Sequence, residues 1–198
     1  MKIFSFEGIE GVGKSTQINL LKEYLETNGY NTEILREPGS TITGESIRSI
    51  LLDSKENLSS ESELLLMFAA RAQLISEKVN NSNSDIILFD RFYDASIAYQ
   101  GFGRNLPIDF IQSLITFINC PEPCLTFLLD ISVQEGFERK VNDVKDRIES
   151  AGIEFFKKVR EGYLEIANNN QSRIKVIDAM QSIDDINKSI IDHVNPLL

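Results

Sequence analysis

Two hydrophobic patterns alternate along the chain. Short, mostly apolar runs are typical of strands, and one of them, Ile86–Phe89, is apolar throughout, as in a strand buried on both faces of a sheet. Between them lie longer segments in which apolar residues recur three or four positions apart, as they do on one face of a helix. The expected strands are Ile3–Phe6, Thr32–Leu35, Ile86–Phe89, Leu125–Leu129 and Ile174–Ile177, and the expected helices are about Lys14–Asn28, Ser46–Leu52, Ser59–Val79, Asp94–Gln100, Ile108–Asn119, Glu149–Asn169 and Ile183–Val194.

The connections between successive strands are too long for hairpins and contain helices. Crossovers of that kind join parallel strands. We therefore expect an α/β protein, a three-layer α/β/α fold with a five-stranded parallel sheet. The chain has 198 residues, of which 42% are hydrophobic. That is enough for a single domain, residues 1–198, whose core needs no disulfide.

The amino-acid composition limits the classes of partner that we expect the protein to bind. The chain carries 20 Lys and Arg against 30 Asp and Glu, a net charge of −10. Such acidity argues against a nucleic acid or an anionic membrane as the main partner, although local cations can still bind a small anion. The apolar run before Glu7 is too short for a secretory signal, and no apolar segment is long enough to span a membrane. These features predict a cytoplasmic protein.

The two cysteines, Cys120 and Cys124, bracket a short proline-containing turn. A zinc site would need two further Cys or His ligands, and the only histidine is His193 near the end of the sequence. We therefore expect two reduced thiols, which is consistent with a reducing compartment.

The strongest motif follows the first expected strand. Residues 8–15 match G-x-x-x-x-G-K-[ST], the P-loop, in which glycines let several backbone N–H groups converge on a phosphate at a helix N-terminus. Lys14 would reach the β- and γ-phosphates of ATP, and the Ser15 hydroxyl would ligate Mg²⁺. The alternative of a structural glycine-rich turn is disfavoured because a strand precedes the motif and a helix follows it. The expected nucleotide-binding residues are Gly8, Ile9, Glu10, Gly11, Val12, Gly13, Lys14, Ser15 and Thr16.

An acidic residue closes the third expected strand. Asp90 comes directly after Ile86–Phe89, and Arg91 follows it. The carboxyl ends of parallel strands meet at one edge of a sheet, so Asp90 should lie beside the P-loop and hold Mg²⁺ with Ser15. The alternative is a local ion pair between Asp90 and Arg91 at the strand end.

Cationic side chains gather in two regions. Phosphoryl transfer needs cations around the moving phosphate and around its acceptor. The residues of the first set lie at the ends of expected strands and helices, and two or three of them could converge on an acceptor phosphate. The second set lies in a stretch without apolar periodicity, which suggests a short lid at about 139–150 or, alternatively, a solvated charged helix. The first set is Arg36, Arg48, Arg71, Arg91 and Arg104; the second is Arg139, Lys140, Lys145 and Arg147.

Several further segments complete a family pattern in the order in which they occur. Taken together they make the chain, over roughly residues 3–180, resemble the thymidylate kinases, which are P-loop nucleoside monophosphate kinases. The P-loop positions 11 and 12 are Gly and Val rather than Arg, so the chain looks like the bacterial type, which draws its catalytic cation from the lid. Besides the P-loop, the segments that carry this resemblance are residues 36–39, 68–71, 90–92, 98–101, 146–149 and 155–164.

The resemblance implies a reaction and a set of roles. The γ-phosphate of ATP would pass to dTMP, giving dTDP for dTTP synthesis, with Mg²⁺ as cofactor and a homodimer as the assembly. The catalytic residues would be Lys14, Asp90, Arg91, Glu10 near the 3′-hydroxyl, and Arg147 as the first candidate among the lid cations. For dTMP, Phe68 would stack on thymine, Arg71, Ser96 and Gln100 would contact the base, Tyr99 would exclude a 2′-hydroxyl, and Arg36, Arg48 and Arg91 would hold the phosphate, with Glu37 beside them.

When the residues are considered without the resemblance, two other functions remain possible. One is a P-loop kinase that acts on another nucleoside or nucleoside monophosphate, because the cationic residues by themselves do not identify thymine. The other is a nucleotide-dependent switch protein that hydrolyses ATP or GTP without a small acceptor. The sequence has no N-K-x-D guanine signature, and a switch would leave the arginine set without a purpose.

Overall fold

The computed structural model describes residues 1–140 and 146–198, and it contains one sheet of five parallel strands in the order β2-β3-β1-β4-β5. This confirms the expected α/β architecture. Each predicted strand is present and extends past its apolar run to a polar or charged residue. The strands are β1 (Lys2–Glu7), β2 (Thr32–Arg36), β3 (Ile86–Asp90), β4 (Leu125–Asp130) and β5 (Ile174–Asp178).

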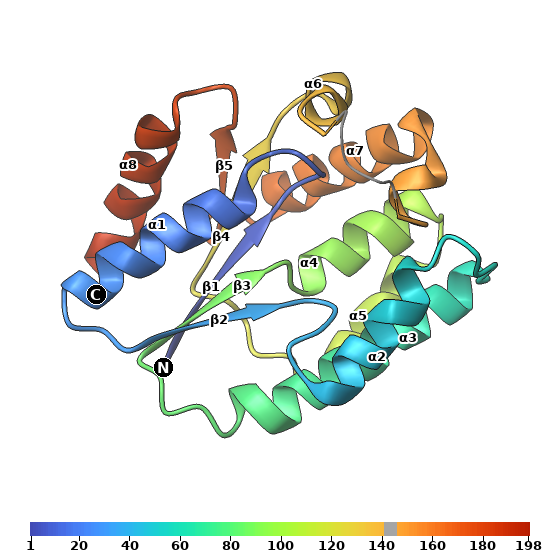
Figure 1. Cartoon of the computed structure of the whole chain (residues 1–198), viewed down its shortest axis with the longest axis horizontal. Helices are drawn as coiled ribbons and strands as arrows, with labels where there is room; N and C mark the ends of the chain where they lie inside the picture. Colours follow the sequence, from blue (N-terminus) through green and yellow to red (C-terminus); the bar gives the residue numbers. More distant parts are fainter. Residues whose placement is uncertain (141–145) are drawn as a thin grey trace.

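Helices cover both faces of the sheet, giving three layers (Figure 1). On one face lie α1 (Lys14–Thr27) and α8 (Ile183–Val194), whose buried side chains include Ile18 and Ile190. Phe4 and Phe6 of β1 are fully buried in the core. The other face carries α2 (Ile42–Leu52), α3 (Ser60–Leu74), η1 (Ile75–Val79), α4 (Tyr93–Ser96), η2 (Ile97–Gly103), α5 (Ile108–Phe117) and α7 (Ile153–Asn169).

Some boundaries differ from the predicted ones for local reasons. The α2 helix begins before Ser46, because Thr41 accepts the backbone N–H of Gly44 as an N-cap, and this first turn has no apolar periodicity. The expected helix from Glu149 is divided into η3 (Glu149–Ala151) and α7, because Gly152 has a φ of 90°. Ser59 is the N-cap of α3, at the predicted start of this helix.

Two short elements were not predicted at all, and two predicted helices end in wider turns. The α6 helix (Val133–Glu138) is too short to show a helical period, and η4 (Asn195–Leu197) is a single turn. The η1 and η2 segments are π-helical continuations of α3 and α4. Such wide turns are frequent at functional sites, and η2 carries Tyr99 and Gln100.

The carboxyl ends of the central strands meet at one edge of the sheet. Phe6 and Arg36 both pair with Asp90, so the ends of β1, β2 and β3 lie in register. The loop that follows β1 therefore lies next to Asp90 and Arg91. In an open α/β sheet this edge is where ligands bind. Among the described residues, no helix has the length and apolar character that crossing a membrane requires.

Candidate active site

The P-loop lies between β1 and α1 and packs tightly against neighbouring backbone. Gly8 has a φ of 132°, and a Cβ there would lie 2.4 Å from the carbonyl oxygen of Leu129. Gly11 has a φ of 77°, and a Cβ there would lie 2.2 Å from the carbonyl oxygen of Gly136. Both positions therefore need glycine for conformation and for space. The loop is fixed in its curled shape by β4 and α6.

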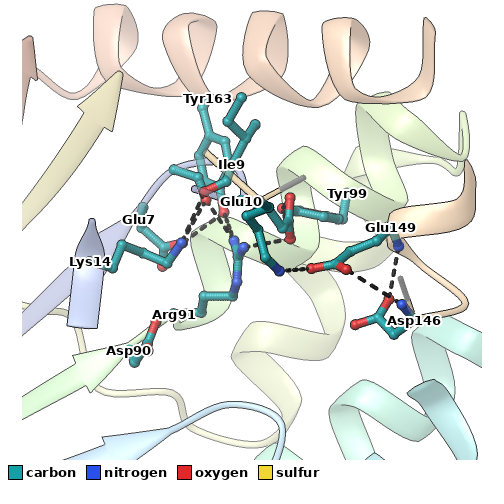
Figure 2. Close-up of polar contacts among 12 residues, drawn as sticks. Glu7, Ile9, Glu10, Lys14, Asp90, Arg91, Tyr99, Asp146, Glu149 and Tyr163 are labelled. Carbon is teal, nitrogen blue, oxygen red and sulfur yellow. Dashed lines mark hydrogen bonds and ion pairs between the residues drawn. The ribbon is translucent and has the colours of Figure 1, made fainter. Parts of the chain in front are cut away.

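Lys14 begins α1 and extends back over the loop (Figure 2). Its Nζ donates to the carbonyl oxygens of Gly8 at 3.3 Å and Ile9 at 3.0 Å. Burial of the ammonium group, with the positive charge of Arg91 nearby, lowers the pKa of Lys14 from its ordinary value. A phosphate at the helix N-terminus supplies the negative charge that favours the protonated amine.

Ser15 and Asp90 lie where a divalent cation would bind. The Ser15 Oγ donates to Asp90 Oδ2 at 3.5 Å, so strand β3 and helix α1 bring these two oxygens together. Within residues 1–140 and 146–198, no group of three or more His, Cys, Asp and Glu side chains could hold a metal alone. Mg²⁺ commonly takes one or two protein oxygens and completes its shell with phosphates and water. The pair fits that requirement.

Arg91 connects the end of β3 to the P-loop (Figure 2). Its φ of 66° is unusual for a residue other than glycine, and strain of this kind is common at functional sites. Its Nη1 donates to the Gly8 carbonyl at 2.8 Å, and its Nη2 donates to Glu10 Oε1 at 2.8 Å. Tyr99 donates its hydroxyl to both Glu10 oxygens, at 2.9 and 3.0 Å, and its ring lies 4.9 Å from the Arg91 guanidinium.

Two residues of this network, Glu7 and Tyr163, were given no role from the sequence. Glu7 is fully buried at the end of β1, where its Oε1 accepts the Phe92 N–H at 2.7 Å and its Oε2 accepts the Tyr163 hydroxyl at 2.8 Å. Arg91 Nη1 donates to Tyr163 at 3.2 Å. Burial, with the charge of Asp94, raises the pKa of Glu7 to about 8. A carboxylate at the end of a buried strand was the available signal.

A cavity of about 490 Å³ opens over the P-loop and extends toward α3 and η2. This volume lies in the range of small-molecule sites. Most of the predicted residues line it, but Gly8, Ile9, Phe68 and Arg147 are not among the lining residues. Those that line it are Glu10, Gly11, Val12, Gly13, Lys14, Ser15, Thr16, Arg36, Glu37, Arg48, Arg71, Asp90, Arg91, Ser96, Tyr99 and Gln100.

Phe68 is the clearest correction. It was expected to stack on the base, but it is 4% exposed and belongs to the core, with the Arg71 guanidinium 4.7 Å above its ring. Its neighbour Met67, one position earlier on α3, lines the cavity instead. A rotation of about 100° per helical residue separates the two side chains, so one faces the core and the other the ligand space. An apolar pair on a helix gives no sequence signal that separates these roles.

Arg71 is held deep in the cavity wall. Its Nε donates to Glu37 Oε2 at 2.7 Å, and its Nη2 donates to the Phe92 carbonyl at 3.3 Å. Both charged side chains are buried. Arg71 Nη1 is also buried, and it has no hydrogen-bond partner among the residues that the structure describes. One donor therefore remains for a ligand.

Arg36 and Arg48 both reach the cavity from β2 and α2. Arg36 makes a two-point contact with Glu45, at 2.9 and 3.1 Å, and Arg48 Nη1 donates to the Pro38 carbonyl at 3.0 Å. Burial, with the charge of Arg36 nearby, lowers the pKa of Arg48. Positive charge is therefore concentrated here, as an anionic ligand would require.

Arg147, the expected catalytic cation of the lid, does not point into the cavity. Its Nη2 donates to Glu63 at 2.7 Å and its Nε to the Leu51 carbonyl at 2.8 Å, so two buried acceptors hold it away from the cavity. Arg139 and Lys140 do line the cavity. Lys145 lies outside the described residues, as do the other positions from 141 to 144, so the predicted lid at about 139–150 is described only at its two ends.

The two described ends of this segment contact one another through an ion pair. Lys140 bonds to the Glu149 carboxylate, and the Glu149 backbone N–H donates to Asp146 Oδ1 at 2.8 Å. Figure 2 shows these two acidic residues on the opposite side of Glu10 from Lys14. Asp146 and Glu149 line the cavity. Both lie in a segment that carries the family resemblance, but neither was given a role from the sequence.

Known proteins with similar sequences and structures agree on one family. The thymidylate kinase family model matches residues 6–190. A thymidylate kinase of Kosmotoga olearia is 44% identical over 191 residues, 94% of this chain and 92% of the relative, and one of Thermoanaerobacter sp. is 42% identical over 202 residues, 100% and 98%. The crystal structure of thymidylate kinase from Ehrlichia chaffeensis superimposes with a TM-score of 0.81 at 32% identity, covering 98% of each chain. The chain belongs to the thymidylate kinase family.

Proposed function

We propose that this enzyme transfers the γ-phosphate of ATP to dTMP and releases ADP and dTDP. The observation that carries the proposal is a single cavity that joins the P-loop to a pocket ending at Arg71 and Gln100. A donor and an acceptor can therefore lie end to end in one site. Membership of the thymidylate kinase family favours this reaction over a nucleotide switch and over another acceptor.

The donor half of the site is built on β1, α1 and β3. Backbone N–H groups of the P-loop and the Lys14 ammonium would surround the β- and γ-phosphates. Ser15 and Asp90 would hold Mg²⁺, which neutralises charge on the phosphate oxygens when it is bound. Glu7 and Tyr163 hold Arg91 in place beneath this loop, so the cation is oriented before substrate arrives.

The acceptor phosphate would lie among Arg36, Arg48 and Arg91. One of its oxygens attacks the γ-phosphorus, a new P–O bond forms, and the bond from that phosphorus to the β,γ-bridging oxygen breaks, leaving ADP. Negative charge spreads over the transferring group during this step, and cations held in advance stabilise it. Arg139 lines the cavity and contacts the Gly11 carbonyl at 3.4 Å, so it replaces Arg147 as the proposed cation from this segment.

The nucleoside would lie against Tyr99 and extend toward α3. Glu10 bonds the Tyr99 hydroxyl, so the tyrosine ring is fixed beside the sugar position, where it would exclude a 2′-hydroxyl. Arg71, Ser96 and Gln100 would contact the edge of the base. Met67 would form an apolar wall of the pocket.

A homodimer is also proposed. Several large apolar side chains of α2, α3 and α5 are exposed, and these helices lie together on one side of the molecule in Figure 1. A second copy of the chain would cover them, because contiguous exposed apolar surface marks interaction sites. Light scattering or sedimentation at micromolar concentration tests this. The exposed side chains are Ile42, Ile50, Leu65, Phe110 and Phe117.

The direct test of the proposed reaction is ADP formation from ATP and Mg²⁺ in a coupled assay. The acceptors are dTMP, dUMP, dCMP, dGMP, UMP and thymidine, with a reaction lacking acceptor as the blank. The proposal requires turnover dominated by dTMP. Turnover that is independent of acceptor, or driven best by thymidine, would contradict it.

A further inference from the structure

Glu63 is a buried carboxylate outside the site described so far. It lies on α3, is 1% exposed, and accepts hydrogen bonds from three side chains. Gln100 Nε2 donates at 2.9 Å, Arg104 donates at 3.0 and 3.2 Å, and Arg147 Nη2 donates at 2.7 Å. Burial works to raise the pKa of Glu63, but the hydrogen bonds from Arg104, Gln100 and Arg147 outweigh it and lower the pKa. Glu63 is therefore ionised at neutral pH.

The ionised carboxylate determines which way the Gln100 amide faces. A carboxylate only accepts hydrogen bonds, whereas an amide has a donating nitrogen and an accepting oxygen. The Gln100 nitrogen must therefore face Glu63, and the amide oxygen is the end that remains for a ligand. Gln100 is 1% exposed and lines the cavity, so the amide cannot turn into bulk solvent.

Arg71 supplies the complementary group in the same pocket. Its Nη1 is a buried donor without a hydrogen-bond partner among the described residues. Its other contacts, to Glu37 and the Phe92 carbonyl, fix the guanidinium in place. The pocket therefore presents one fixed donor and one fixed acceptor to the base.

We propose that Glu63 is a positioning residue that sets base selectivity by holding the Gln100 amide oxygen toward the acceptor nucleotide. The proposal rests on the proposed function. A donor and an acceptor in the wall of one pocket match a base with a carbonyl next to a ring N–H, which is the edge that thymine and uracil present. Cytosine has an amino group and an unprotonated ring nitrogen there, so both contacts are lost and buried polar groups are left unpaired.

The test compares two variants, each of which removes one charged side chain from the same partly buried ion pair. Glu63→Gln replaces the carboxylate by an amide that can donate or accept, so it no longer forces one orientation on Gln100. Arg104→Gln removes an ion pair from the same carboxylate but leaves the bond from Gln100 to Glu63 intact. For wild type and both variants, kcat/KM is measured with dTMP and with dCMP, and folding is followed by thermal denaturation.

We expect Glu63→Gln to lower the dTMP-to-dCMP ratio of kcat/KM at least about tenfold, mainly through the KM for dTMP. Arg104→Gln should lower the melting temperature and leave that ratio within about twofold of wild type. A wild-type ratio in Glu63→Gln would overturn the role of Glu63 while the proposed function stands. A wild-type enzyme that does not prefer dTMP would overturn the proposed function itself.

A second measurement on the wild-type protein applies even if Glu63→Gln fails to fold. The Gln100 side-chain amide is assigned in the ¹⁵N spectrum, and its exchange with water is followed before dTMP is added. The proposal requires this amide to exchange much more slowly than exposed glutamine side chains. Exchange as fast as that of exposed glutamines would show that Glu63 does not hold Gln100.

Discussion

The most specific prediction concerns two adjacent residues on α3, of which Phe68 lies in the core and Met67 lines the cavity. Phe68→Leu changes a core side chain that is 4% exposed, whereas Met67→Ala shortens a half-buried side chain that lines the cavity. Conservative swaps in a core cost up to about 1.5 kcal/mol, and for a chain of this size each kcal/mol lowers the melting temperature by about 2–4 °C. Phe68→Leu should therefore melt about 2–6 °C below wild type.

Met67→Ala should affect binding instead. It removes the outer groups of a wall that the base would bury, and each buried methylene-sized group contributes about 0.8 kcal/mol. For two such groups this is roughly 1–2 kcal/mol, which corresponds to about a 5- to 30-fold rise in the KM for dTMP. Arg71 stays anchored by Glu37 in both variants, so the base contact it supplies should survive.

The assay is a steady-state titration of dTMP at saturating ATP, with thermal denaturation of each variant in parallel. The reasoning requires Phe68→Leu to change the KM for dTMP less than about threefold. A more than tenfold rise in Phe68→Leu, together with an unchanged KM in Met67→Ala, would show that the aromatic ring contacts the base and that the cavity wall has been misassigned.

Three further substitutions test the remaining parts of the account. Lys14→Ala should lower kcat by at least about 100-fold while the thermal transition stays normal, because it removes a cation from the transferring phosphate. Near-normal turnover would contradict the assignment of residues 8–15 as a catalytic P-loop. Tyr99→Ala should increase the use of UMP relative to dTMP while Tyr99→Phe preserves the preference, and unchanged UMP use in Tyr99→Ala would disprove the steric role. Glu7 has a pKa of about 8, above the ordinary 4.5, so the unfolded chain loses this proton first. The free energy of unfolding should therefore fall between about pH 4.5 and 8, by roughly 5 kcal/mol at most. Glu7→Gln should flatten that fall in denaturant titrations at pH 5 and 8, and an equal slope in both proteins would assign the pH dependence to other groups.

The fold was largely predictable because its strands and helices follow from hydrophobic patterns along the sequence. Strands of a buried parallel sheet are mostly apolar, and all five were found from short runs of that kind, of which Ile86–Phe89 alone is apolar throughout. The P-loop was equally accessible, since its glycines are required by space: a Cβ at Gly8 or Gly11 would lie only 2.4 or 2.2 Å from the carbonyl oxygen of Leu129 or Gly136. Helix starts such as that of α2 were less accessible, because a cap at Thr41 depends on one side-chain hydrogen bond.

Most of the cationic residues of the site could be predicted from the sequence. The direction in which each side chain points could be predicted less well. Arg91 and Arg71 were both assigned to the site, and both line the cavity. Arg147 was assigned by its place in a charged segment, but its contacts to Glu63 and Leu51 come from elements about 84 and 96 positions away in the chain. Phe68 failed for a similar reason, because only packing decides which side of α3 meets the ligand.

The central claim is that the γ-phosphate of ATP moves to dTMP in this cavity. ATP labelled at the γ-phosphate is incubated with the enzyme and Mg²⁺, with dTMP, with thymidine or without acceptor, and the products are separated. The account predicts label in the β-phosphate of dTDP, formed only with dTMP and in amounts equal to the ADP released. Label released as inorganic phosphate at the same rate in all three reactions would contradict it.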